Sequence, residues 1–558
     1  MLISSSYSGM NTHQGIEYIF SDYQKLDDPT INDFISSIPY SLNQAASDVL
    51  NSFSSDKTKI RCRTILKTQV EKFHKQIDTL TPGVNNSIRF VDLKDTKILI
   101  AIHQPNLFAY GGVFKKIILL QALKSHILRK DSSQNIVSLF LIINHDFMGD
   151  FWTRVAELPS IKSSDGILEL RYGVTPHNRW KMTSNSPPPS SAILEKWERQ
   201  VGNWIKNCSL PLGEEKEKFI DNFADFWTIV EYSRSRAKSY SDFNSFLMSI
   251  IANKIWDYDT LFVNLTDLAV AFEDGYKFLI SNNMRFAETL KDCEKTFDQF
   301  GVRKGFSSNS YLYAPIWLHC KCGSKAPSTL VIESGMIMGT GNCMACKNSI
   351  KLNFGSPTNP IIGPDIISNI SPRAIPILLL LSRELNTSCY VTGTGGSLRY
   401  TLVASKVFKA LDINSPVSIL WPSNDEYIGI GQEEARHYSK YSSVRDMKSY
   451  LDDLYRRVEE ERSVILPLIK ERNRLIENNL PIDSLLKKIF LVKEHQREIR
   501  NLIAETKKVI SAIELKPCII DYVVNFGIKE IEVIWRSALH STDDLFSPIS
   551  FPNRNSKT

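Results

Sequence analysis

Two short apolar runs separated by a helical stretch constrain the fold of this chain more than any other feature. Residues 97–102 (KILIAI) and 136–143 (IVSLFLII) are rich in β-branched and large apolar side chains, as buried strands are. Between them, Gly111 and Gly112 precede a helical pattern over residues 113–128. A strand, a helix and a strand within about 50 residues predict a parallel βαβ unit with helices on the faces of the sheet.

Three later runs extend the predicted sheet. They are residues 260–263 (TLFV), 388–392 (SCYVT) and 417–420 (VSIL). A glycine turn and a helix over residues 398–411 lie between the last two runs. We therefore expect an α/β fold with a parallel-sheet core, whose two halves are separated by inserted connecting segments.

A long helical hairpin is predicted near the C-terminus. Residues 478–481 (NNLP) form its turn, and apolar side chains recur at alternating three- and four-residue spacing in the second helix. This is the seam of a coiled coil, in this case an antiparallel one. Such hairpins serve oligomerisation or packing more often than catalysis. The seam positions are 485, 489, 492, 496, 499, 503, 506, 510 and 513.

These patterns divide the chain into six segments. The segments are an N-terminal helical segment (1–90), the first half of the core (91–160), a mostly helical connecting insertion (161–310), a zinc-ribbon-like insert (311–355), the second half of the core (356–435), and the coiled-coil hairpin with a helical tail (436–558).

Composition excludes several classes of protein. With 558 residues, 42% of them hydrophobic, the chain can bury a large core, which excludes disorder as its main state. A net charge of +6 is too dilute to indicate a nucleic-acid binder. The longest apolar run, residues 374–381, is far shorter than the roughly 20 residues of a membrane helix. The N-terminus lacks a signal-peptide pattern, so we expect a cytoplasmic protein without membrane association.

Four of the nine cysteines form two close pairs, Cys320-Lys-Cys322 and Cys343-Met-Ala-Cys346. The odd total argues against an oxidised, secreted scaffold. Four thiolates from two such pairs suit a tetrahedral structural zinc ion, which has no open position for catalysis. The alternative is two unrelated pairs of thiols.

Polar residues follow the first two predicted strands directly. His103 and Gln104 end the first, and Asn144, His145 and Asp146 end the second. In open parallel sheets, ligands bind beyond the carboxyl ends of the strands. Two histidines and a carboxylate there could bind phosphate, activate an amine or transfer protons. Alternatively, these groups only form hydrogen bonds within loops.

A glycine-rich turn, residues 392–397 (TGTGGS), follows the fourth strand and opens a helix. Its backbone N–H groups can approach an anion at the positive end of that helix. The turn lacks the Gly-Lys-Ser/Thr of a phosphate-binding loop, and a plain tight turn is an equal alternative.

The order of these motifs resembles the bacillithiol biosynthesis cysteine-adding enzymes (BshC). The resemblance is carried by residues 103–108 (HQPNLF), the following helix with Lys115, residues 144–147 (NHDF), residues 371–373 (SPR) and residues 393–400 (GTGGSLRY). It implies a Rossmann-like core, a coiled-coil arm that pairs two chains into a homodimer, and ligase chemistry. The enzyme would join cysteine to the amino group of an amino-sugar conjugate, glucosaminyl-malate. Because this condensation is uphill in water, activation by a nucleotide such as ATP is expected.

The resemblance also assigns roles to individual residues. His103 and His145 would act as acid–base or phosphate-contacting groups, and Asp146 would orient a histidine or hold the substrate amine. The substrate or nucleotide would be held by Gln104, Asn106, Lys115, Asn144, Arg373, Gly393, Gly395, Gly396 and Ser397.

Three positions depart from the family's pattern. Asn144 and Ser397 stand where the family has acidic residues, and Ile377 where it has an arginine. These changes should alter the cation or amine that the site accepts. Two alternative functions follow. One is a protein that binds nucleic acid or a protein partner through the zinc ribbon and coiled coil, with a vestigial pocket. The other is a nucleotidyltransferase-like enzyme with a different substrate.

Overall fold

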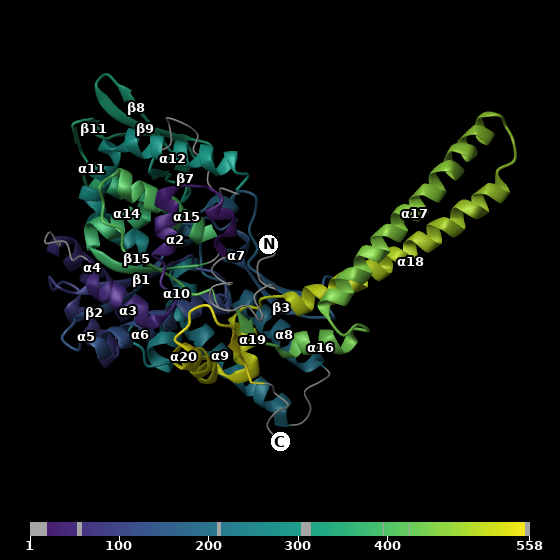
Figure 1. Cartoon of the computed structure of the whole chain (residues 1–558), viewed down its shortest axis with the longest axis horizontal. Coiled ribbons are helices and arrows are strands. Elements are labelled where there is room, and N and C mark those ends of the chain that lie inside the picture. Colours follow the sequence, from purple (N-terminus) through teal and green to yellow (C-terminus); the bar gives the residue numbers. More distant parts are fainter. Residues whose placement is uncertain are drawn as a thin grey trace.

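The computed structural model describes residues 19–52, 59–208, 214–302, 314–393, 396–422 and 424–552. A large α/β body carries a long two-helix arm that projects away from it (Figure 1). Within the described residues, no helix combines the length and the apolar character that crossing a membrane requires.

The body is built around a sheet of five parallel strands. The strands are β1 (Lys97–His103), β2 (Ile136–Ile142), β5 (Leu261–Asn264), β14 (Thr387–Thr392) and β15 (Val417–Leu420). Their order across the sheet is β15-β14-β1-β2-β5. The chain runs outward from β1 to β5, then returns to place β14 on the other side of β1. The predicted mixed α/β fold with a parallel sheet is therefore confirmed.

Helices cover both faces of this sheet. Helix α6 (Gly111–Lys130) connects β1 to β2, and α15 (Gly396–Ala410) connects β14 to β15. Because these right-handed crossovers proceed in opposite directions along the sheet, they lie on opposite faces. All seven residues of β2 are buried, as expected for a strand covered on both sides.

Further helices of the body come from three stretches of the chain. Those preceding the sheet are α2 (Pro29–Ser36), α3 (Leu42–Asn51), α4 (Ile60–Gln76) and α5 (Pro82–Phe90). Those between β2 and β14 are α7 (Phe151–Arg154), η1 (Asn178–Trp180), η2 (Thr183–Asn185), α8 (Ser191–Asn207), α9 (Glu214–Arg236), α10 (Tyr240–Ile250), η3 (Ile251–Ile255), η4 (Leu265–Phe272), α11 (Glu273–Ser281), α12 (Asn283–Gln299), α13 (Pro364–Ile367) and α14 (Ala374–Leu385). Those after β15 and outside the arm are α16 (Ile430–Tyr438), α19 (Ile519–Phe526) and α20 (Ile528–Thr542).

Small sheets form the cysteine-containing insert and the edges of the body. The insert contains the three-stranded sheets β13-β6-β7 and β10-β9-β8. Strand β13 lies beyond residue 355, so the insert shares a sheet with the segment that follows it. The strands are β6 (Ile316–His319), β7 (Lys325–Pro327), β8 (Thr329–Glu333), β9 (Met336–Asn342), β10 (Ser349–Asn353) and β13 (Ile370–Pro372), with pairs β3 (Val155–Pro159) and β4 (Ile167–Arg171), β11 (Gly355–Ser356) and β12 (Asn359–Pro360), and β16 (Asp425–Glu426) and β17 (Ile549–Ser550).

The arm consists of α17 (Val444–Glu477) and α18 (Asp483–Glu514), which pack along one another. Near its middle, Leu454 packs against Ile499 and Ile503 in a small buried cluster. The predicted long helices are confirmed. Of the predicted seam positions, the buried ones are Ile489, Ile499, Ile503, Ile510 and Ile513.

Candidate functional site

The polar residues that follow β1 and β2 lie together at one edge of the sheet. His103 ends β1, and Asp146 lies in the turn after β2. The amide Nε2 of Gln104 donates a hydrogen bond of 2.6 Å to Asp146 Oδ2. This edge adjoins the place where the strand order reverses, between β1 and β14, which is where open α/β sheets bind ligands.

His103 is a neutral imidazole at neutral pH. Burial lowers the pKa of its side chain to about 3, and the nearby Lys116 ammonium adds to the shift. Its Nδ1 lies 2.9 Å from the carbonyl oxygen of Gln104. Because a carbonyl only accepts hydrogen bonds, the proton of the neutral ring lies on Nδ1. The lone pair is then on Nε2, where it can accept a proton.

His145 and Asp146 are neighbours with different surroundings. His145 is buried, and its Nε2 lies 3.8 Å from Asp146 Oδ1. Burial, then the charges of Lys325 and His319, hold the pKa of His145 well below its usual value. No described residue offers a hydrogen-bond partner to its Nδ1. Burial raises the pKa of Asp146, and Lys325 and Gln104 oppose that shift.

Lys325 is a site residue that the sequence analysis missed. It begins β7, is only 1% exposed, and its Nζ lies 3.9 Å from Asp146 Oδ1. The rings of Phe147 and Trp317 lie 4.7 and 4.5 Å from the ammonium, where their faces attract a cation. Burial lowers the pKa of Lys325 to about 8, although Asp146 opposes the shift. No local motif marks this lysine, because strand pairing brings it to the site.

Of the two adjacent lysines in α6, Lys116 faces the sheet edge and the predicted Lys115 does not. Lys116 Nζ donates to the carbonyl oxygen of Ile102 at 3.2 Å, and burial lowers its pKa to about 8. Lys115 Nζ instead forms a 2.9 Å ion pair with Asp425. Consecutive residues on a helix point about 100° apart, so one of the two must face away from the edge.

The glycine turn lies close to Lys116. A Cβ atom added to Gly393 would lie 4.0 Å from Lys116 Nζ. The turn is closed by Ser397, whose hydroxyl accepts from the Gly393 N–H at 3.0 Å and donates to its carbonyl at 3.1 Å. Gly396 begins α15. Gly395 lies outside the described residues.

The remaining residues of the predicted site differ in the contacts that their side chains make. The side-chain amide of Asn144 donates to the Thr266 hydroxyl at 2.7 Å and accepts from the Thr266 N–H at 3.1 Å. These two hydrogen bonds hold the end of β2 to η4. Asn106 is buried, and its Oδ1 has no hydrogen-bond partner in the described part of the chain. Arg373 precedes α14, with its guanidinium 4.8 Å from the centre of the Trp317 ring.

The electrostatics of the edge favour an anionic ligand. Lys325 and Arg373 both lie against Trp317, and Lys116 approaches from α6. Asp146 is the acidic group in contact with this cluster through Lys325. Cations in excess over carboxylates can hold a carboxylate or phosphate group, and the neutral His103 offers an unprotonated Nε2 at the same edge.

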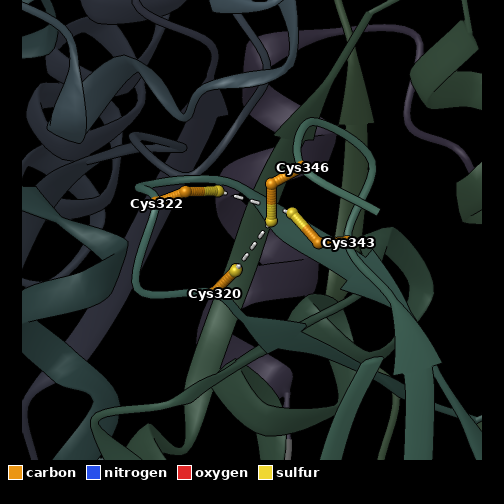
Figure 2. A group of neighbouring side chains, drawn as sticks. All are labelled: Cys320, Cys322, Cys343 and Cys346. Atoms are coloured by element: carbon orange, nitrogen blue, oxygen red, sulfur yellow. Dashed lines mark hydrogen bonds between the residues drawn. The ribbon is translucent and has the colours of Figure 1, made fainter. Parts of the chain in front are cut away.

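The four paired cysteines converge in the insert (Figure 2). Their Sγ atoms all lie within 4.8 Å of one another. Sγ separations of 3.6 Å (Cys320 and Cys346) and 3.5 Å (Cys322 and Cys343) are too long for disulfides. They suit sulfur atoms around a tetrahedral ion with Zn–S bonds of about 2.3 Å.

Backbone geometry around the cysteines suits thiolate ligands. Burial raises the pKa of Cys343, but hydrogen bonds from the N–H groups of Cys346 and Ala345, together with the thiols of Cys322 and Cys346, outweigh it and bring the pKa to about 6. Gly323 adopts a positive φ of 87°, which an L side chain rarely adopts, and its N–H bonds the Cys320 carbonyl at 2.9 Å. The cluster is therefore a candidate metal centre.

No protein-family model matches the chain, and the search of curated proteins found no match to it. Its function is therefore inferred from the chemistry of the sheet edge and of the cysteine cluster.

Proposed function

We propose that the protein is an amide-bond-forming ligase that adds cysteine, or a related amino acid, to an amino-sugar conjugate such as glucosaminyl-malate. The observation that carries the proposal is the polar edge beside the place where the strand order reverses. There Gln104 bonds Asp146 at 2.6 Å, and Lys116 lies near enough to His103 to lower its pKa. The resemblance of the motifs at 103–108 and 144–147 to the cysteine-adding enzymes supports the same reaction.

The side chains at the edge suit the two needs of this reaction. A carboxylate must be activated and held, and the attacking amine must lose a proton. In the proposed reaction, the ammonium groups of Lys116 and Lys325 would attract carboxylate or phosphate oxygens, and the Nε2 lone pair of His103 would take the proton. Asp146 can hold the amine before it reacts. A nucleotide such as ATP would convert the carboxylate oxygen into a leaving group.

The fold and assembly that we propose for the protein follow the same resemblance. The five-stranded sheet is the Rossmann-like core, and α17 and α18 are an antiparallel coiled coil that pairs two chains in a cytoplasmic homodimer. The cysteine cluster holds one structural Zn²⁺ through Cys320, Cys322, Cys343 and Cys346. Four sulfur ligands close the coordination shell, so the ion stabilises the insert and takes no part in the chemistry.

A related enzyme with a different acceptor is the second candidate. At the two positions where the family has acidic residues, Asn144 bonds Thr266 and Ser397 closes the glycine turn. Neither side chain therefore supplies a carboxylate to hold the amine of the family's substrate. Consumption of a nucleotide without amide formation would favour this nucleotidyltransferase-like alternative.

Mass spectrometry of a single reaction tests the proposal. The protein is incubated with cysteine and glucosaminyl-malate, with and without ATP. The proposal expects a product with the mass of both substrates less one water, and its dependence on ATP reports how the carboxylate is activated. Absence of the product with folded, zinc-containing protein would contradict the substrate assignment.

A further inference from the structure

The insert that carries the four cysteines also delivers Lys325 to the sheet edge. Lys325 lies three residues beyond Cys322, at the start of β7, where it pairs with His319 of β6. Its ammonium contacts Asp146 and the Trp317 and Phe147 rings. One short segment therefore provides both a candidate metal ligand and a buried cation of the candidate site.

Both cysteine pairs touch the backbone that carries this lysine. On one side, the Cys320 N–H bonds the carbonyl of Ser324, the residue before Lys325, at 2.8 Å. On the other, the N–H of Met344, between Cys343 and Cys346, bonds the Lys325 carbonyl at 3.2 Å. A metal ion bound by both cysteine pairs would therefore hold the start of β7 in place from both sides.

The same turn is connected to the loop that carries Asp146. The Gly323 carbonyl accepts from the N–H of Met182 at 3.0 Å, and the next residue, Thr183, donates its N–H to the Asp146 carbonyl at 2.8 Å. Lys325 and Asp146 thus belong to two segments that meet through η2. A shift of the cysteine turn would change the distance between them.

We propose that metal binding by the four cysteines positions Lys325 at the sheet edge, so that metal occupancy controls whether the candidate site is complete. Without the ion, the two cysteine turns are connected through backbone hydrogen bonds such as that from Met344 N–H to the Lys325 carbonyl, and exposed turns of this kind can open locally without global unfolding. Opening would withdraw the Lys325 ammonium from Asp146. The consequence for substrate binding rests on the proposed function, whereas the metal-dependent position of Lys325 does not.

Amine acylation measured by peptide mass spectrometry tests this inference. The full chain is labelled with acetic anhydride as purified, after removal of zinc with a chelator, and after zinc is restored. We expect labelling of Lys325 to become faster by about tenfold or more on zinc removal, because a buried amine becomes accessible on local opening. Restored zinc should return protection.

Two variants and one reference lysine serve as controls for the labelling experiment. Cys346→Ser removes one ligand and should expose Lys325 to labelling. Lys321→Ala changes an exposed residue between two ligands and should leave protection intact. Lys124 of α6, paired with Asp259, reports on the body of the protein and should stay protected throughout.

Three results would overturn the inference. They are failure of the chain to bind zinc, unchanged labelling of Lys325 after measured zinc loss, and equal exposure of Lys124, which would make the metal a determinant of the whole fold. Because labelling does not require the ligase reaction, an inactive protein with zinc-dependent protection of Lys325 would contradict the proposed function alone.

Discussion

Asp146 connects the two halves of the candidate site at the scale of single residues. Its carboxylate accepts from Gln104 on the β1 side and lies 3.9 Å from Lys325 on the insert side. Because Lys325 is almost fully buried, it depends on this negative charge. Because the two side chains form a charge pair, removal of either one should destabilise the other.

Asp146→Asn should therefore remove activity and also destabilise the fold. The change leaves a buried ammonium without its counter-charge, at a cost of about 1–3 kcal/mol. Ligase turnover and chemical denaturation would measure the two effects. Asp150→Asn, in the same loop, is the matched control. Full activity of the Asp146 variant would exclude a role for this carboxylate in the reaction.

The two buried ammonium groups predict a pH dependence. The pKa values of Lys116 and Lys325 are both lowered to about 8, so both side chains are charged below that pH and neutral above it. Affinity for an anionic substrate should fall as the pH rises through about 8, by up to about tenfold per pH unit for each charge lost. Calorimetric titration with glucosaminyl-malate across this range would measure it.

Lys325→Arg is the control for this pH dependence. Because arginine stays protonated at every accessible pH, the variant should show a shallower loss of affinity above pH 8 than the natural chain. An unchanged affinity of the natural protein from about pH 7 to about pH 9.5 would contradict the role of the lysines.

At the scale of elements, the arm and the body have separate apolar clusters. Leu454, Ile499 and Ile503 form a small cluster in the arm, whereas the core of the body is one large cluster that runs through the sheet and its covering helices. The arm should therefore loosen without unfolding the body.

Leu454→Ala should destabilise the arm locally. Removing this fully buried leucine is expected to cost about 2–5 kcal/mol. Hydrogen exchange should accelerate in α17 and α18 and stay unchanged in β1 and β2. Leu466→Ala, at a side chain that is 48% exposed on the same helix, should have no effect. Faster exchange throughout the body would show that the two parts unfold together.

At the largest scale, the arm presents apolar side chains that the rest of the described chain leaves exposed. Phe490 and Leu491 are 59% and 65% exposed in α18. Large exposed apolar patches mark surfaces that bind a partner, and these two adjacent side chains are candidates for part of such a surface. In the proposed homodimer, the arms of two chains would cover these side chains.

Replacing Phe490 and Leu491 by serine should convert the homodimer into monomers, because it removes apolar area from the proposed interface. Light scattering during size-exclusion chromatography would measure the molar mass. Lys493→Ala, a nearby exposed change, should leave the mass unchanged. A natural chain that is monomeric at all concentrations would contradict the dimer.

Local sequence patterns were enough to predict the strands of the central sheet and the helices of the arm. Periodicity is a local property, so the runs at 97–102 and 136–143 predicted β1 and β2, and the spaced apolar residues after position 485 predicted α18. The spacing of the cysteines predicted the cluster that forms in the insert. The convergence of Gln104 and Asp146 also followed from sequence, because parallel strands bring their carboxyl ends to one edge.

The long-range packing of the chain determines which other side chains join Gln104 and Asp146 at the edge. Lys325 is 179 positions from Asp146, and only the pairing of β6 with β7 and β13 brings it there. The rotation of α6 about its axis points Lys116 toward the edge and Lys115 toward Asp425. The contact between β2 and η4 places the Asn144 amide in a hydrogen bond with Thr266. Such choices depend on strand register and helix rotation between distant segments, which no local pattern encodes.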